Sequence, residues 1–234
     1  MSSASEHLNR KFQEALTYIQ RGQLARAEAS FEEVLRIQPK HRNALMGLGI
    51  IASQSKNPQK ALSLFDKAIE IDPTSAAAFN NKGLVLQQLG QWEAALASFD
   101  RVIALKADST EAHFCRGHVL KDLCRLDAAL ASYERVIGLK PDFADAHFCR
   151  GLVLKILNQP DAALASYDRA IALKADFAIA YSNRGVVLRE LQQLDAALAS
   201  FERAIALKAE YAETYYNRGL VLEDFNRPDA ALAS

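Results

Sequence analysis

The chain has 234 residues, of which half are hydrophobic and 24% are charged. This composition excludes a disordered protein. Basic and acidic residues balance at 28 each, so the chain lacks the overall basic excess that is typical of proteins bound to a nucleic-acid backbone.

The N-terminal segment 1–7 has neither the basic nor the apolar region of a signal peptide. No apolar run approaches the length that spans a bilayer. The cysteines Cys115, Cys124 and Cys149 form no CxxC pair, which favours free thiols in a reducing compartment. We therefore expect a cytoplasmic protein that contacts neither membranes nor nucleic acid.

The chain repeats itself with a period of 34 residues. A small residue, an alanine and an aromatic residue recur in register from copy to copy. The small residues are Ala15, Gly49, Gly83, Gly117, Gly151, Gly185 and Gly219. The alanines are Ala27, Ala61, Ala95, Ala129, Ala163, Ala197 and Ala231, and the aromatic residues are Phe31, Phe65, Phe99, Tyr133, Tyr167 and Phe201. Three series in one register predict an array of structural repeats.

The copies divide the chain into a lead-in and seven repeats. The lead-in is 1–7, and the repeats are 8–41, 42–75, 76–109, 110–143, 144–177, 178–211 and the shortened 212–234. The last copy stops inside its second helix, so we expect that end to fray or to pair end to end with another copy of the chain.

Each repeat is predicted to form two helices. In the third copy, Gly83 and Leu86 lie on one apolar helical stripe, and Ala95 and Phe99 lie on another. Gly83 and Ala95 allow the two helices to approach closely, and Phe99 fills the wider gap beside them. We predict that the glycines, alanines and aromatic residues of the three series have this structural role.

Helix boundaries are indicated by prolines and acidic residues. Pro58, Pro160 and Pro228 stand where second helices are predicted to begin. Asp108 and Asp142 are predicted to cap the first helices that follow them.

This pattern resembles the tetratricopeptide repeat family over residues 8–234. Counted from the start of each repeat, the small residue is at position 8, the alanine at position 20 and the aromatic residue at position 24, as in that family. The resemblance implies an all-α fold, a right-handed superhelical solenoid of antiparallel helix hairpins. It also implies that the first helices line a concave groove that binds a protein or an extended peptide.

Asparagine recurs at groove position 6, as Asn81, Asn183 and Asn217. An amide can both donate to and accept from a peptide backbone. The YSNRG segment at Tyr181 resembles the repeat arms of bacterial peptide O-glycosyltransferases of the O-GlcNAc type, which carry an asparagine ladder. Here Gly47, Cys115 and Cys149 interrupt that ladder. The alternative is that these amides are merely solvated.

Cations recur at position 12 in three successive repeats, as Lys121, Lys155 and Arg189. With His118 nearby, they could bind an acidic peptide in the groove. The alternative is that they only satisfy the C-terminal ends of their helices.

Cations also occupy position 7, which is nearly core-facing. They are predicted to form a structural ladder with carboxylates of neighbouring second helices, for example Asp100, Glu134, Asp168 or Glu202. The cations are Lys82, Arg116, Arg150, Arg184 and Arg218.

Histidines and cysteines cluster in two adjacent repeats and superficially suggest zinc: His113, Cys115, His118, His147 and Cys149. Equivalent atoms of adjacent helices are about 8–10 Å apart, whereas zinc ligands must meet at about 2.3 Å from one point. We therefore expect no metal, no cofactor and no catalytic residue.

Two functions follow from this sequence. The first is a protein–protein interaction scaffold. The alternative is the substrate-recognition arm of a larger enzyme, of the bacterial O-linked glycosyltransferase type, whose catalytic domain lies outside this chain.

Overall fold

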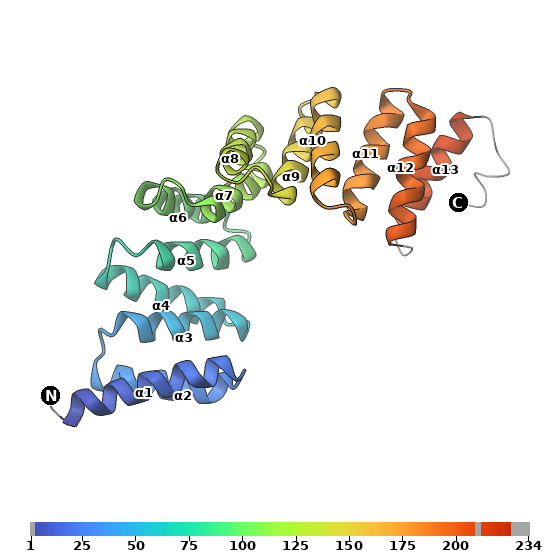
Figure 1. Cartoon of the computed structure of the whole chain (residues 1–234). Coiled ribbons are helices and arrows are strands. Elements are labelled where there is room, and N and C mark those ends of the chain that lie inside the picture. The colour runs from blue at the N-terminus through green and yellow to red at the C-terminus, as the bar shows by residue number, and fades with distance from the viewer. Residues whose placement is uncertain (1–2, 209–211, 226–234) are drawn as a thin grey trace. The chain divides into compact units, whose positions relative to one another are not determined.

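The computed structural model describes residues 3–208 and 212–225, which form helices joined by short turns (Figure 1). Successive helices are α1 (Ser3–Gln20), α2 (Leu24–Ile37), α3 (Arg42–Gln54), α4 (Pro58–Ile71), α5 (Ala76–Gln88), α6 (Trp92–Leu105), α7 (Thr110–Asp122), α8 (Leu126–Leu139), α9 (Ala144–Ile156), α10 (Pro160–Leu173), α11 (Ala178–Glu190), α12 (Leu194–Leu207) and α13 (Ala212–Asp224). From α3 onward, every first helix begins at the residue where a repeat is predicted to start. Helix α1 begins earlier than the predicted repeat start at Leu8. The end of repeat 7 and its predicted fraying or self-association lie outside the described residues.

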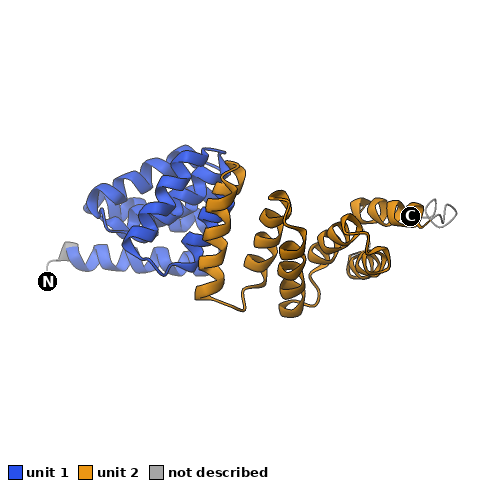
Figure 2. Cartoon of the chain, turned by 90° about the horizontal axis from the view of Figure 1, so that it is seen from above, with its two compact units in different colours: residues 1–119 blue, residues 120–234 orange. Residues whose placement is uncertain are grey.

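The chain divides into two compact units, unit 1 (residues 1–119) and unit 2 (residues 120–234), coloured separately in Figure 2. In unit 1, the helices pack as hairpins α1–α2, α3–α4 and α5–α6, and in unit 2 as α9–α10 and α11–α12. Within each unit, the second helix of one hairpin also contacts the first helix of the next. The predicted all-α solenoid of antiparallel hairpins is confirmed.

The odd-numbered first helices also contact one another directly within each unit, α3 with α5, α9 with α11, and α11 with α13. The surface that each unit builds from them is here called the first-helix face. Among the described residues, no helix has the length and hydropathy required to cross a bilayer.

The predicted helix starts at Pro58 and Pro160 agree with the structure, and Pro228 lies outside the described residues, whereas the predicted aspartate caps are wrong. Pro58 and Pro160 are the first residues of α4 and α10. The Ala112 amide donates to Ser109 Oγ at 3.3 Å, directly before α7, and the residue that precedes α9 is Phe143. Both aspartates therefore lie one residue too early, because the capping side chain belongs to the residue that immediately precedes the helix.

The interhelical gap at position 8 is closed by an aromatic ring. A Cβ atom built on Gly83 would lie 2.8 Å from Phe99 Cε1, and one built on Gly151 would lie 2.6 Å from Tyr167 Cε1. Gly185 and Phe201 repeat the arrangement at 2.7 Å. The ring therefore occupies the space that any side chain at position 8 would need.

Further described members of the three series are buried as well, and Ala231 lies outside the described residues. Ala95, Ala129, Ala163, Ala197, Phe99, Tyr133, Tyr167 and Phe201 have no exposed surface, and Gly117 and Gly219 are buried.

Repeat 1 departs from this packing because it has Ala15 at position 8. The ring of Phe31 packs instead against Gly47 in the next repeat, where a built Cβ atom would lie 2.5 Å from Phe31 Cε2. Gly47 is thus a packing residue, which explains why the asparagine series is interrupted there.

The turn between the two helices of a repeat has one residue in the left-handed region. This residue is glycine in two repeats, Gly22 (φ 69°) and Gly90 (φ 68°). The equivalent Lys56, Cys124, Asn158 and Gln192 adopt φ values of 56°, 56°, 57° and 59°. For most residues that have a Cβ atom, this conformation costs about 1–2 kcal/mol.

Replacing Lys56 or Gln192 by glycine should therefore stabilise the chain. We expect a gain of about 0.5–1 kcal/mol, since the relieved strain exceeds the extra entropy that glycine loses on folding. Native-state hydrogen exchange of the amides in the two helices that flank the turn measures the change in single variants. Gly90→Ala is the matched reverse substitution and should destabilise; a gain there, or a loss in Lys56→Gly, would contradict the assignment of strain.

Candidate functional site

The predicted groove asparagines lie on the first-helix faces of both units. Asn81 is on α5 in unit 1, while Asn183 and Asn217 are on neighbouring helices α11 and α13 in unit 2. All three are half-buried. The Asn183 amide donates to the Ile179 carbonyl of its own helix at 2.9 Å. The second N–H of this amide and its carbonyl oxygen are the groups that a ligand could use without replacing this hydrogen bond.

The predicted groove cysteines are shielded from water. Cys149 is 6% exposed, and Cys115 is half-buried. Burial raises the pKa of the Cys149 thiol to about 12, and the nearby Asp145 carboxylate adds to the shift. Burial, followed by the charge of Glu111, raises the pKa of Cys115 to about 11. Neither thiol is therefore a nucleophile near neutral pH.

Alkylation of the native chain by iodoacetamide at pH 8 should therefore be selective. Cys124 is exposed and should react first, whereas Cys115 and Cys149 should react at least about ten-fold more slowly because their thiolate fractions are small. Peptide mass spectrometry over time gives the three rates. Denatured chain is the control, in which all three should react alike; equal rates in the native chain would contradict the burial described above.

The histidines are used in local contacts. His118 lies edge-on to Phe114, with ring centroids 4.6 Å apart. The Nε2 atoms of His113 and His147 lie 3.0 Å from the carbonyl oxygens of Ala107 and Pro141. Within residues 3–208 and 212–225, no group of three or more His, Cys, Asp or Glu side chains is arranged to bind a metal ion.

The position-12 cations of unit 2 are paired with carboxylates. Lys155 Nζ lies 3.8 Å from Glu190 Oε1, and Arg189 Nε lies 2.6 Å from Asp224 Oδ2, so each pair joins successive first helices. The hydrogen bond to Asp224 raises the pKa of Arg189. Lys121 pairs with Asp122 on its own helix at 2.7 Å. The residue on the next helix that corresponds to Glu190 and Asp224 is Ile156, which offers Lys121 no carboxylate.

The predicted ladder at position 7 is confirmed for three of the four carboxylates named above. Each cation reaches the second helix of the preceding repeat. The distances are 2.6 Å for Arg116–Asp100, 3.5 Å for Arg150–Glu134 and 2.6 Å for Arg184–Asp168, and Lys82–Asp66 adds a further pair at 2.6 Å. In the part of the chain that the structure describes, no ion pair joins Arg218 to Glu202.

The ladder arginines of unit 2 also donate to serines of their own repeat. Arg150 Nη1 donates to Ser166 Oγ at 3.1 Å, and Arg184 Nη1 donates to Ser200 Oγ at 2.6 Å. These arginines therefore tie successive repeats together.

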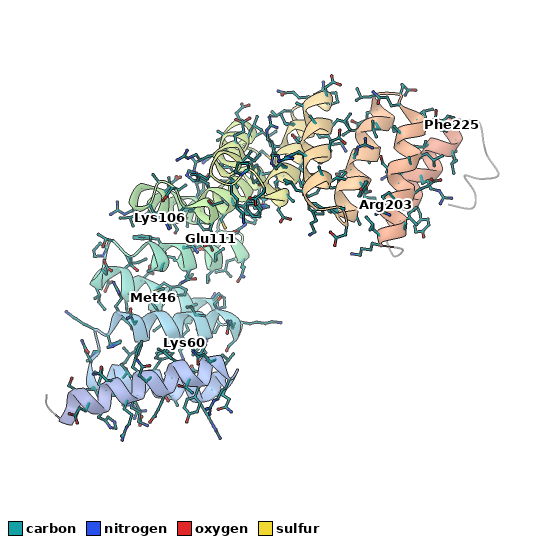
Figure 3. The ribbon with its side chains drawn as sticks, in the orientation of Figure 1. Met46, Lys60, Lys106, Glu111, Arg203 and Phe225 are labelled. Carbon is teal, nitrogen blue, oxygen red and sulfur yellow. The ribbon has the colours of Figure 1, made fainter. Side chains whose placement is uncertain are left out.

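The first-helix face of unit 1 contains an apolar hollow that no sequence prediction named. Its volume is about 610 Å³, within the range of about 300–1,000 Å³ that is usual for ligand sites. Phe12, Leu16 and Ile19 of α1 line one side, and Met46 and Ile50 of α3 line the other (Met46 is labelled in Figure 3).

The hollow is open and its walls are exposed. Leu16 and Ile19 are each 36% exposed, and Ile50 is 39% exposed. Its sequence signal lies at positions 9 and 12, which are apolar in repeat 1 but carry His118 and Lys121 in repeat 4. The aligned repeats show these apolar residues but do not tell whether they lie on an exposed surface or in a core.

Family comparisons agree with the helical repeat. Sequence models of the tetratricopeptide repeat match residues 12–76, 48–118 and 144–177, and a further TPR-repeat model matches 125–158 and 187–224. The chain is therefore a tetratricopeptide-repeat protein. No curated protein sequence matches it significantly.

Solved structures share this fold. MamA is 25% identical with a TM-score of 0.66, over 69% of this chain and 94% of MamA. The pilF protein of Pseudomonas aeruginosa is 18% identical with a TM-score of 0.75, over 96% of this chain and 99% of pilF. YrrB, described as a TPR protein with an unusual peptide-binding site, is 21% identical with a TM-score of 0.69, over 84% of this chain and 97% of YrrB.

Proposed function

We propose that this chain is a protein–protein interaction scaffold whose first-helix faces bind a peptide or a partner protein. The observation that carries the proposal is the open apolar hollow of unit 1. Exposed apolar side chains gathered in one place on a surface are typical of interaction sites. A repeat array also offers an extended surface on which several helices contact one ligand.

In unit 2, we propose that the same kind of face contributes polar contacts. Asn183, Asn217, Lys155 and Arg189 lie on its first helices, together with the end of α7 that carries Lys121. A ligand that binds there would compete with Glu190 and Asp224 for the cations. An acidic ligand suits this arrangement because it can replace those carboxylates one for one.

To test the proposal, the full chain is immobilised and binding peptides are selected from a phage-displayed library of random 16-residue peptides. Enriched peptides should bind in solution, and hydrogen exchange of the complex should show protection concentrated on the first helices. Protection confined to the second helices, or no enriched peptide, would contradict the proposal.

The enzyme-arm alternative rests on the YSNRG segment. It predicts the same peptide-binding faces and, in addition, glycosyl transfer to the bound peptide by a longer protein that includes this chain. Loss of transfer on deletion of the repeats would favour the alternative over a free-standing scaffold.

A further inference from the structure

We propose that the hollow of unit 1 binds one amphipathic helix of a partner protein, with a stripe of apolar side chains and an acidic side chain that reaches Arg42. The proposal rests on the function proposed above and names the class of ligand for that site. Its three parts are the apolar stripe, the helical backbone and the acidic residue, and each depends on a different observation.

The apolar part follows from two stripes of helical spacing. Phe12, Leu16 and Ile19 are spaced i, i+4, i+7 on α1, and Met46 and Ile50 are spaced i, i+4 on α3. Helices α1 and α3 run in the same direction because α2 is antiparallel to both. The longer stripe extends about 10 Å at 1.5 Å per residue. The two apolar stripes, one on α1 and one on α3, form parallel ridges. A third helix can pack into the groove between two such ridges.

The helical part follows from the apolar part of the hollow, between α1 and α3, which offers few hydrogen-bonding partners to a peptide backbone. The five side chains named above are apolar and supply no strong hydrogen-bonding group. At position 6 of α3, where other repeats have asparagine, the chain has Gly47, which has no amide. An extended peptide would bury unpaired N–H and C=O groups on this floor, which is unfavourable. A helix satisfies those groups internally and can occupy the hollow without such a loss.

The acidic part follows from the charges at one end of the hollow. Arg42, Asn43, Asp72, Thr74 and Ser75 line that end. The Asp72 carboxylate accepts from the Thr74 hydroxyl at 2.6 Å, from the Thr74 amide at 3.0 Å and from Arg42 Nη1. These contacts, Thr74 first, hold the pKa of Asp72 below its ordinary value. Asp72 is therefore an anion that already accepts three hydrogen bonds from this end of the hollow.

At this end of the hollow, Arg42 is the charged side chain that can donate hydrogen bonds to a ligand. Its Nη1 donates to Asp72 and its Nε donates to Asn43 Oδ1 at 3.3 Å, while the side chain remains 45% exposed. A guanidinium has five N–H donors, so these contacts leave others for an incoming carboxylate. Such a bond is charge-assisted and is stronger than a neutral hydrogen bond. The spare N–H groups of Arg42 are therefore the donors that an acidic side chain beside the apolar stripe would meet, next to the existing Arg42–Asp72 pair.

The probes are the peptides enriched from the phage library on the full chain. The proposal expects a consensus with apolar residues at i, i+4 and i+7 and one Asp or Glu, and a rise in helical circular dichroism on binding. Proline in the middle of the peptide should abolish binding. A basic consensus, or binding that tolerates the proline, would overturn the class of ligand while leaving the scaffold function intact.

Two protein variants locate the site. Ile50→Glu should weaken binding at least about ten-fold, because a charge would be buried against the apolar stripe. Ile37→Glu is the matched control, since Ile37 is 41% exposed on the second helix α2 of the same unit and does not line the hollow, and it should leave the affinity unchanged. Leu16→Ser is a milder second variant, and circular dichroism verifies folding of all three. Peptides that bind Ile50→Glu and Leu16→Ser as well as the parent chain would overturn the proposal but not the scaffold function.

A charge swap tests the acidic contact. Arg42→Glu should weaken the acidic peptide about ten-fold or more, as expected for a charge-assisted bond, and a peptide with Lys in place of the acid should recover affinity for this variant. No recovery would overturn the role of Arg42. Light scattering of the free chain tests whether a second copy of the chain occupies the hollow. The proposal expects a monomer, and a dimer that dissociates in Ile50→Glu would overturn it.

Discussion

Phe99→Ala should lower the free energy of local unfolding by about 3–5 kcal/mol, the usual cost of removing a fully buried aromatic ring. The ring has no exposed surface and fills the space left by Gly83. Gly83 has no side chain and Ala95 has only a methyl group, so neither can fill the space that the ring vacates. The cavity that remains adds to the lost burial.

Native-state hydrogen exchange of the α5 and α6 amides measures this loss. A repeat array does not unfold as one two-state unit, so a local probe is required. Ile37→Ala is the control, since this isoleucine of α2 is 41% exposed and its truncation should cost less than about 1 kcal/mol. A similarly small loss in Phe99→Ala would show that the hairpin does not depend on the ring.

Gly49→Ala should destabilise the chain by about 1–2 kcal/mol even though alanine is the better helix former. The built Cβ atom would lie 2.5 Å from Phe65 Cε1 and 2.9 Å from Phe65 Cζ. Phe65 is 1% exposed and has no free space in which to withdraw. Overpacking of this kind costs about 1–3 kcal/mol, which outweighs a propensity gain of about 1 kcal/mol.

Gly138→Ala is the matched control for Gly49→Ala. Gly138 lies on the exposed side of α8, where a built Cβ atom meets no described atom within 4 Å. Only the propensity gain applies there, so this variant should be stabilised by about 0.5–1 kcal/mol. Native-state hydrogen exchange of the α3 and α4 amides in Gly49→Ala, and of the α8 amides in Gly138→Ala, measures the two changes. The same sign of change in both would show that the ring does not constrain position 8.

The sequence was sufficient for the fold because its signals are repeated in register. A single glycine such as Gly83 predicts little about structure. When a small residue, an alanine and an aromatic residue recur at the same positions in copy after copy, the copies are expected to pack in the same way. The position-7 ladder was predictable for the same reason. Arg184 and Asp168 each recur at a fixed position, so one plausible pair implied the others.

Features that belong to a single repeat were not predictable in this way. Gly47 was taken as a gap in a ligand-binding series, yet it accommodates the ring of Phe31, because Ala15 closes the usual place for that ring. The position-12 cations were considered as ligand-binding groups, but their pairing with Glu190 and Asp224 depends on how neighbouring helices are aligned. The hollow depends on two helices together, and neither apolar stripe alone distinguishes an exposed surface from a core.

The ladder that links repeats 3 to 6 each to the repeat before it also makes the length of this protein easy to change. Arg184 finds its partner in whichever complete repeat precedes it, because each of the six complete repeats carries an acid at the equivalent place. Removal of residues 144–177 would set Arg184 against Glu134 in place of Asp168, a carboxylate for a carboxylate. A gene that gains or loses a whole number of copies thus encodes a junction at which the ladder positions still match, whereas a deletion whose length is not a multiple of 34 residues would misalign the ladder. Unequal recombination between the similar copies can therefore lengthen or shorten the array while the ladder stays in register.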